Sequence, residues 1–298
     1  MQVAVTGSSG LIGTALTAAL RADGHRVIRL VRAGPAAPDT LLWDPRAERG
    51  GLDPRSLEGV GAVVHLAGAG VADKRWTQGY RAEIRVSRVQ GTRALVTALT
   101  AMAAPPGVLL AGSAIGWYGD TGGREVTESD PAGRGFLPDV VREWEAAAGE
   151  AASAGIRVVT LRSGIVLSRH GGILGRLLPL FRLGLGGKLG SGRQMMSWIG
   201  LPDWVAAARF LLDRADITGP VNLTSPNPVS NAEFTTALAH AVHRPAMFPV
   251  PVPALKIAVG GVSSDILSSA RVTPKRLLAA GFGFQHAGIA GALAAELA

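Results

Sequence analysis

The chain has 298 residues, 47% of them hydrophobic and 17% charged, a balance that excludes an intrinsically disordered chain. Its formal charge of +8 is carried almost entirely by arginine, which suits bidentate contacts with phosphate and carboxylate groups. Without cysteine, the chain has no disulfide, thiolate metal site or cysteine nucleophile, and a cytoplasmic location is expected. His240 and His243 are spaced like metal ligands, but no third ligand accompanies them, so no metal site is predicted.

Two classes of large partner are disfavoured. The chain begins directly on a strand pattern, so no signal peptide is expected, and its apolar runs are interrupted before the ~20 residues of a membrane span. A basic protein can also bind nucleic acid, but the basic residues are not interleaved with aromatic ones and no nucleic-acid motif is present. We therefore expect a small phosphorylated ligand, with neither nucleic acid nor membrane as partner.

Strand-like and helix-like segments alternate through the first two-thirds of the chain. Strands are predicted over 2–6, 25–32, 62–66, 108–111 and 156–161, and helices over 11–22, 77–102 and 138–154. Short apolar strands separated by helices are typical of a parallel sheet covered on both faces. The sequence therefore predicts an α/β fold, a doubly wound parallel sheet of the Rossmann type.

The last third has a different character. Residues 171–192 are rich in glycine, and a proline-rich run at 245–253 lies between further expected helices. We interpret residues 1–225 as an NAD(P)-binding Rossmann domain, with 168–200 contributing to a substrate lobe. Residues 226–298 then form a small C-terminal lobe.

A glycine motif stands between the first predicted strand and the first predicted helix. Gly7, Gly10 and Gly13 follow the spacing Gly-x-x-Gly-x-x-Gly. By analogy with dinucleotide-binding loops, Gly7 makes a tight turn, Gly10 lets the backbone approach a pyrophosphate, and Gly13 allows close helix–strand packing. The following helix N-terminus offers free N–H groups to phosphate. This context favours a dinucleotide site over an ordinary glycine turn.

The end of the second predicted strand decides between the two nicotinamide dinucleotides. NAD-preferring sites place an Asp or Glu there, which binds the ribose 2′-hydroxyl. This strand ends in Leu30-Val31-Arg32, without a carboxylate. Arginine is suited to pairing with a 2′-phosphate, so we predict NADP(H) as the cofactor. The alternative is a solvated arginine at the strand end.

Further short stretches along the whole chain carry a family pattern. They include Trp43-Asp44-Pro45, Leu66-Ala67-Gly68, Ser87-Arg88, Ser113 to Gly119, Trp144-Glu145, Arg162 to Leu167, Ser197-Trp198-Ile199, Asn222-Leu223 and Gly281-Phe282. With them the chain resembles an extended short-chain dehydrogenase/reductase, specifically the atypical epimerase-like branch. Giant-chloroplast proteins and bacterial proteins labelled cell-division inhibitors resemble that branch too. Where relatives show Trp-Ile-His, this chain has Gly200, so no histidine role is carried over.

The resemblance implies a set of cofactor contacts and a homodimer through the long helix. Arg88 takes the position of an asparagine near the active site of extended members, and it ends a stripe begun by Arg81 and Arg85 whose alternative role is a solvated or dimer-facing surface. The glycine-rich segment 171–192 either wraps an anionic group or forms a flexible loop. The residues predicted to bind the cofactor are Gly7, Ser9, Gly10, Leu11, Ile12, Gly13, Arg32, Leu66, Ala67, Gly68, Arg88, Arg162, Gly164 and Val166.

The usual proton-transfer groups of this family are missing. Short-chain dehydrogenases use a Ser or Thr, a Tyr, and a Lys four residues after the Tyr. The only tyrosines are Tyr80 and Tyr118, and neither is followed by lysine at that spacing. Counting from neighbouring motifs, Leu137 and Val141 occupy the tyrosine and lysine positions, and Ala114 occupies that of the hydroxyl.

Two functional hypotheses remain. In the first, an NADP(H)-dependent oxidoreductase or epimerase acts on a small or sugar-nucleotide-like anionic substrate through non-standard residues. Ser113 and Tyr118 are then the catalytic candidates, with Asp139 and Glu143 nearby. In the second, the chain binds NADP(H) without turnover, as a regulator or scaffold.

Overall fold

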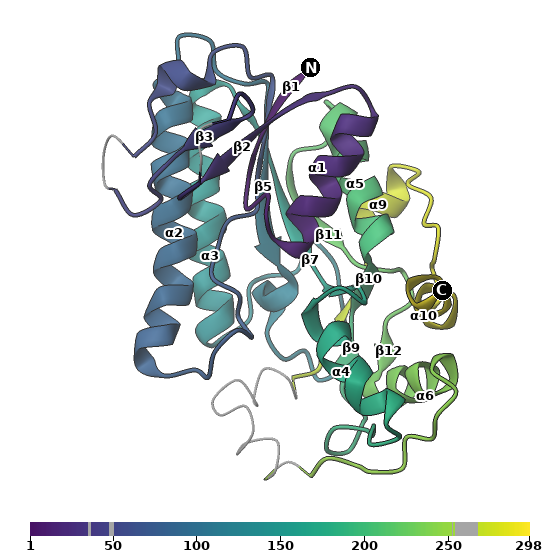
Figure 1. The fold of residues 1–298 in the computed structure, drawn as a ribbon. Coiled ribbons are helices and arrows are strands. Elements are labelled where there is room, and N and C mark those ends of the chain that lie inside the picture. The colour runs from purple at the N-terminus through teal and green to yellow at the C-terminus, as the bar shows by residue number, and fades with distance from the viewer. Residues whose placement is uncertain (35–36, 48–50, 252, 254–267) are drawn as a thin grey trace.

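One seven-stranded parallel sheet forms the centre of the molecule (Figure 1). The computed structural model describes residues 1–298 except 35–36, 48–50, 252 and 254–267. The strand order is β11-β7-β5-β4-β1-β2-β3, so the direction of winding reverses between β1 and β4. In such sheets ligands bind beyond the carboxyl ends of the strands at the reversal point. This confirms the predicted Rossmann-type fold, and its strands are β1 (Gln2–Thr6), β2 (Arg26–Val31), β3 (Thr40–Leu42), β4 (Ala62–His65), β5 (Val108–Ala114), β7 (Arg157–Ser163) and β11 (Gly219–Leu223).

Helices cover both faces of the sheet, α1 and α5 on one and α2 and α3 on the other (Figure 1). Successive strand residues point to opposite faces, so Val3 and Val5 join one core while Ala4 joins the other. All three side chains are fully buried, which is why the strands read as continuous apolar runs. The covering helices are α1 (Leu11–Ala22), α2 (Gln78–Thr100), α3 (Phe136–Gly149) and α5 (Leu201–Asp213).

A third core, centred on the buried Trp198 and Phe234, lies beside the sheet. Segments from both sides of residue 225 build this core, so the predicted domain boundary stays a prediction. Within the described ranges, no helix combines the length and apolar character that crossing a bilayer requires. The elements of this part are β8 (Ile165–Leu167), α4 (Gly172–Arg182), β9 (Met195–Met196), β10 (Trp198–Gly200), β12 (Val229–Ser230), α6 (Asn231–Ala241) and α10 (Ile289–Leu297).

Shorter elements complete the described chain. β6 (Glu125–Val126) pairs in parallel with β13 (Arg271–Val272), and α9 (Lys275–Ala279) packs near β11. The 3-10 turns are η1 (Pro54–Leu57), η2 (Ile115–Tyr118) and η3 (Glu150–Ala154). The third of these continues α3, so the single helix predicted over 138–154 is an α-helix followed by a 3-10 turn.

Candidate functional site

The glycine loop lies at the reversal point of the sheet, between β1 and α1. Gly7 has φ +66°, and a Cβ there would lie 2.7 Å from the backbone carbon of Leu66. A Cβ on Gly13 would lie 2.1 Å from the carbonyl oxygen of Gly7, so both positions require glycine. Gly10 is the N-cap of α1, and no side chain caps the helix. The first-turn N–H groups therefore remain available to a phosphate, as dinucleotide binding requires.

A buried hydrogen-bond chain fixes the predicted segment Leu66–Gly68 opposite Gly7. The hydroxyl of Thr6 accepts from the backbone N–H of Leu66 at 3.0 Å and of Ala67 at 3.1 Å. With its lone pairs used, it donates to Nδ1 of His65 at 2.7 Å. The other ring nitrogen of His65 then carries the proton and donates to the Thr92 hydroxyl at 3.0 Å. The neutral imidazole thus supports the loop that faces the glycine turn.

The buried histidine predicts a pH dependence of stability. Burial lowers the pKa of His65 from 6.5 to about 4. Between these values the unfolded chain binds a proton that the folded chain does not, so the free energy of unfolding falls as the pH decreases through this range. The loss is roughly 3 kcal/mol from pH 7 to pH 4. Urea titrations at pH 7 and pH 4 should show wild type losing about 3 kcal/mol more free energy of unfolding than His65→Gln does. Equal losses in the two proteins would contradict the prediction.

Arg32 lies exposed just beyond the end of β2, with no carboxylate at the strand tip. Asp39, from the neighbouring edge, pairs with Arg21 and lies 3.8 Å from Arg29. Within the described part of the chain, no carboxylate pairs with Arg32. Its guanidinium is therefore presented to solvent at the end of the strand where the predicted 2′-phosphate contact would form.

Both predicted catalytic hydroxyls belong to one largely buried network. Ser113 donates to Glu145 at 2.5 Å, and Glu145 accepts two hydrogen bonds from Arg162 at 2.8 and 2.9 Å. Arg162 also donates to the Tyr118 hydroxyl at 3.1 Å, which in turn donates to Asn222 at 2.7 Å. Burial raises the pKa of Tyr118 to about 12, so it holds its proton at neutral pH. The geometry favours a structural role for both hydroxyls, and their catalytic role stays a prediction.

The same network uses the side chain of Arg162, which was predicted to contact the cofactor. That side chain is 3% exposed and is directed at the carboxylate of Glu145. Gly164 lies close to β10, since a Cβ there would be 2.7 Å from the Ser197 carbonyl oxygen, and Val166 pairs with β10 within β8. The three predicted residues therefore lie between the end of β7 and β8. The Arg162 side chain is engaged with Glu145, and the positions of Gly164 and Val166 are fixed mainly by backbone contacts with β10.

The positions of the usual tyrosine and lysine carry an apolar surface. Leu137 and Val141 lie one turn apart on α3 and face the 3-10 turn η2. A Cβ built on Gly116 would be 3.4 Å from the Leu137 Cβ and 3.8 Å from a Val141 methyl carbon. No group that exchanges a proton stands at either position.

The two acidic candidates are engaged on the protein surface. Glu143 pairs with Arg85, and Asp139 pairs with Arg142, and all four side chains are partly exposed. Arg81, the other exposed member of the predicted arginine stripe, stacks over an aromatic pair at 5.4–5.5 Å. These surface contacts explain the positions of Asp139, Glu143 and Arg81 without requiring a catalytic role for them.

Arg88 differs from its neighbours on the stripe because it points to the end of β4. Its guanidinium lies 5.1 Å from the ring centre of Trp144 and donates to the carbonyl oxygen of Ala69 at 2.8 Å. A Cβ on Gly68 would lie 3.4–3.5 Å from the Arg88 side chain. The structure thus brings Arg88 against the predicted Leu66–Gly68 segment.

The glycine-rich segment 171–192 is only partly a loop. Residues 172–182 form α4, and its start packs on the glycine loop, since a Cβ on Gly171 would lie 3.5 Å from a Leu11 methyl carbon. Arg176 donates to the Ala72 carbonyl oxygen and approaches Asp73. Whether this segment wraps an anion stays a prediction.

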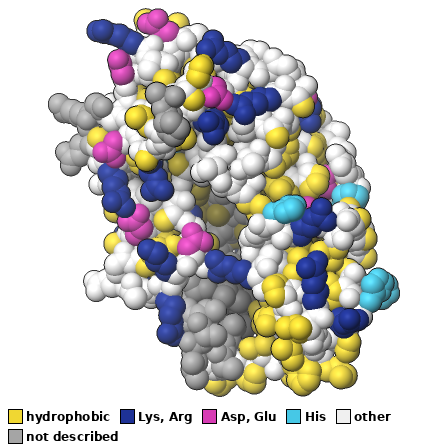
Figure 2. All heavy atoms as spheres, in the orientation of Figure 1, with side chains coloured by type: hydrophobic (Ala, Val, Ile, Leu, Met, Phe, Trp, Pro, Cys, Tyr) yellow, Lys and Arg dark blue, Asp and Glu magenta, His cyan; other side chains and the backbone are white. Residues whose placement is uncertain are grey.

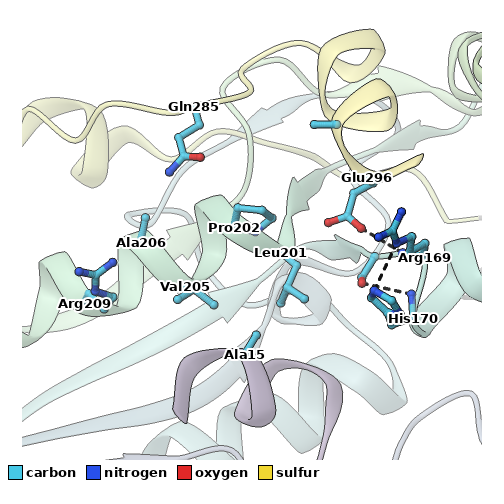
Figure 3. A pocket seen from close by; sticks show the side chains of 12 residues that line it. Ala15, Arg169, His170, Leu201, Pro202, Val205, Ala206, Arg209, Gln285 and Glu296 are labelled. Atoms are coloured by element: carbon cyan, nitrogen blue, oxygen red, sulfur yellow. Dashed lines mark hydrogen bonds between the residues drawn. The ribbon is translucent and has the colours of Figure 1, made fainter. Parts of the chain in front are cut away.

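A pocket of about 470 Å³ lies between α1, α5, the residues after β8 and α10 (Figure 3). Arg169, His170, Arg209 and Glu296 supply its polar rim, and Ala15 marks the side formed by α1. None of the residues predicted for cofactor binding or catalysis lines this pocket. It is therefore separate from the glycine loop and its surroundings.

Basic side chains on the surface are mixed with acidic ones, and several of them form ion pairs. Figure 2 shows basic and acidic side chains interspersed over the upper and left parts of one face. Exposed ion pairs such as Arg21–Asp39 and Arg46–Glu83 bring residues of opposite charge together on the surface. Among the described residues, no group of three or more His, Asp or Glu side chains is placed to hold a metal ion.

The fold and the glycine loop together define an α/β protein of the dinucleotide-binding Rossmann class. The model of the NAD dependent epimerase/dehydratase family matches residues 3–224, and a domain of unknown function, DUF1731, matches residues 250–296. The chain belongs to this epimerase/dehydratase family, which confirms the resemblance found in its sequence.

Similar proteins match along nearly the whole chain. An epimerase family protein of Mycobacterium tuberculosis is 48% identical over 294 residues, which are 98% of this chain and 96% of the relative. The crystal structure of human epimerase family protein SDR39U1 with NADPH has a TM-score of 0.90 and 33% identity, and covers 100% of this chain and 99% of that one. A nucleoside-diphosphate sugar epimerase from Corynebacterium glutamicum has a TM-score of 0.82 and 36% identity, and covers 100% of this chain and 58% of that one.

Proposed function

We propose that the chain binds NADP(H), with the pyrophosphate at the first turn of α1 and the 2′-phosphate at Arg32. The observation that carries this proposal is the loop geometry: Gly7 and Gly13 keep the backbone open, and the uncapped helix start leaves N–H donors for phosphate. Arg32 is exposed and has no carboxylate partner among the described residues, which supports the choice of the phosphorylated dinucleotide. The NADPH in the human relative is consistent with that choice.

Arg32→Ala is expected to weaken NADPH binding at least about tenfold while leaving NADH binding nearly unchanged, since only NADPH offers the 2′-phosphate. Calorimetric titration of both dinucleotides measures this difference. Arg26→Ala is a matched control, because Arg26 is also exposed on β2 but stands at its opposite end. Equal NADPH and NADH affinities in the wild type, or NADPH affinity unaffected by Arg32→Ala, would reject the assignment.

The proposed activity is redox chemistry on a small or sugar-nucleotide-like anionic substrate. The Corynebacterium relative described as a nucleoside-diphosphate sugar epimerase supports this substrate class. When bound, the nicotinamide supplies or accepts the hydride. This chain's residues position the cofactor and shape the adjoining surface, while Tyr118, with its raised pKa and its bond to Asn222, is not suited to move a proton at neutral pH.

A second candidate function is NADP(H)-dependent regulation without turnover. The specific observation in its favour is the apolar pair Leu137 and Val141 at the positions of the usual tyrosine and lysine. Absorbance of reduced nicotinamide distinguishes the two functions when carbonyl compounds and nucleotide sugars are screened. Oxidation of NADPH by any of them supports the enzyme, whereas tight NADPH binding without oxidation across the panel supports the regulator.

A further inference from the structure

The guanidinium of Arg88 is a partly buried cation that lies beside the segment Leu66–Gly68. Each of the other arginines on its side of α2 is exposed and engaged, Arg85 with Glu143 and Arg81 with an aromatic pair. Arg88 instead turns inward, to the carboxyl end of β4, and within the described ranges it has no ion-pair partner. Burial lowers its pKa to about 10, against the smaller opposing electrostatic effects of Tyr80 and Asp73, neither of which is in hydrogen-bond or ion-pair contact with it.

Only one edge of this guanidinium is used by the protein. The NH1 nitrogen donates to the carbonyl oxygens of Ala69 at 2.8 Å and Ile84 at 3.2 Å. The Nε and NH2 nitrogens have no acceptor among the described residues, and neither is sealed from solvent. These two N–H groups are parallel, the arrangement that binds two oxygens of a carboxylate or phosphate.

The stem and plane of Arg88 are held in place by packing. Its guanidinium stacks over the indole of Trp144. The same indole packs closely on Gly112 of β5, where an added Cβ would lie 3.0 Å from the ring. Gly112 directly precedes Ser113, so the free edge belongs to the region where β4 and β5 end. This is the side of the sheet where a substrate would lie beside the cofactor.

We propose that the Nε–NH2 edge of Arg88 binds an oxyanion of the substrate, either a carboxylate or a phosphate. This inference rests on the proposed function for the position of the cofactor, and it reassigns Arg88 from the cofactor contact predicted from sequence to the substrate. A bound anion gives this cation a direct ion pair, and the pre-stacked guanidinium loses little conformational entropy on binding it.

The test is a calorimetric titration of NADPH-saturated protein with malonate and, separately, with inorganic phosphate, at constant ionic strength. One equivalent of at least one anion is expected to bind, and Arg88→Met is expected to weaken that binding at least about tenfold while NADPH affinity is retained.

The variants separate the charge of Arg88 from its two parallel N–H groups. Methionine keeps an unbranched stem over Trp144. Arg88→Lys keeps the charge but loses the pair of parallel N–H groups, so it should give an intermediate loss. Arg93→Met, at an exposed position on α2, is the matched control and should bind as wild type does. Thermal melting establishes that each variant is folded.

Several results would overturn the inference. Failure of wild type to bind either anion removes the proposed role, and so does binding of both anions by Arg88→Met as tightly as by wild type. Loss of NADPH affinity in Arg88→Met assigns the side chain to the cofactor instead. If wild type binds no NADPH, the proposed function fails separately, and titration of the cofactor-free protein then decides the role of Arg88 by the same comparison.

Discussion

Replacing Glu145 by alanine is expected to lower the free energy of unfolding by about 3–5 kcal/mol, because it leaves a buried arginine without its counter-ion. Arg162 is 3% exposed, and the Glu145 side chain accepts two of its hydrogen bonds as well as the one from Ser113. The variant therefore removes three hydrogen bonds at once, one from Ser113 and two from Arg162. Urea unfolding followed by circular dichroism measures the loss.

Two further variants separate the ion pair from its surroundings. The double change Glu145→Leu with Arg162→Met removes both charges and is expected to cost less than the sum of the single changes, since neither charge is then left unpaired. Glu83→Gln, in the exposed pair with Arg46, should change stability by about 1 kcal/mol or less. Equal losses for Glu145→Ala and Glu83→Gln would show that the buried network contributes no more than a surface pair.

Much of the sheet could be predicted because its central strands are apolar on both faces. The strands predicted over 2–6, 25–32, 62–66, 108–111 and 156–161 correspond to β1, β2, β4, β5 and β7, although β5 continues to Ala114. β3 has only three residues at the sheet edge, and β11 begins with Gly219-Pro220 and contains Asn222, a composition typical of turns. Pairing with β2 and β7, rather than local preference, makes these two segments strands.

α4 shows the same effect of tertiary packing on a helix. Gly172, Gly175 and Pro179 suggested a loop. The apolar residues Leu174, Leu178 and Phe181 nevertheless recur at helical spacing, and all are buried in the third core, around Trp198 and Phe234. Their burial outweighs the unfavourable helix propensity of the glycines.

The candidate site divides in a similar way. The glycine spacing and the missing carboxylate after β2 are local features, so the sequence alone indicates them. The network of Ser113, Tyr118 and Arg162 depends on residues far away in the chain, such as Asn222, which is 104 positions from Tyr118. Sequence spacing gave no sign that these hydroxyls serve the fold, nor that Arg88 keeps one edge free while its neighbours are engaged.

Gly7→Ala is expected to lose most NADPH affinity and to destabilise the protein by about 2–4 kcal/mol. An alanine at φ +66° adopts a strained left-handed conformation, which costs about 1–2 kcal/mol. Its Cβ would also stand 2.7–2.9 Å from backbone atoms of Leu66 and Ala67, and rigid backbone cannot move aside as a flexible side chain would. Relief of this contact must displace either the glycine turn or the loop that Thr6 and His65 hold in place.

Gly10→Ala is the matched control within the same loop. Gly10 has φ −76°, which alanine adopts freely, and its Cβ would lie 3.3 Å from the single nearby atom, the Gly7 carbonyl oxygen. This contact is tight but much less severe than those at Gly7, so Gly10→Ala should lose less stability than Gly7→Ala. A loss of NADPH affinity beyond what its stability explains then reports contact with the ligand. Unfolding titrations and NADPH calorimetry on both variants provide the comparison. A Gly7→Ala protein that is destabilised but keeps wild-type NADPH affinity would show that the pyrophosphate is not bound at this turn. Wild-type stability would instead contradict the predicted steric strain at Gly7.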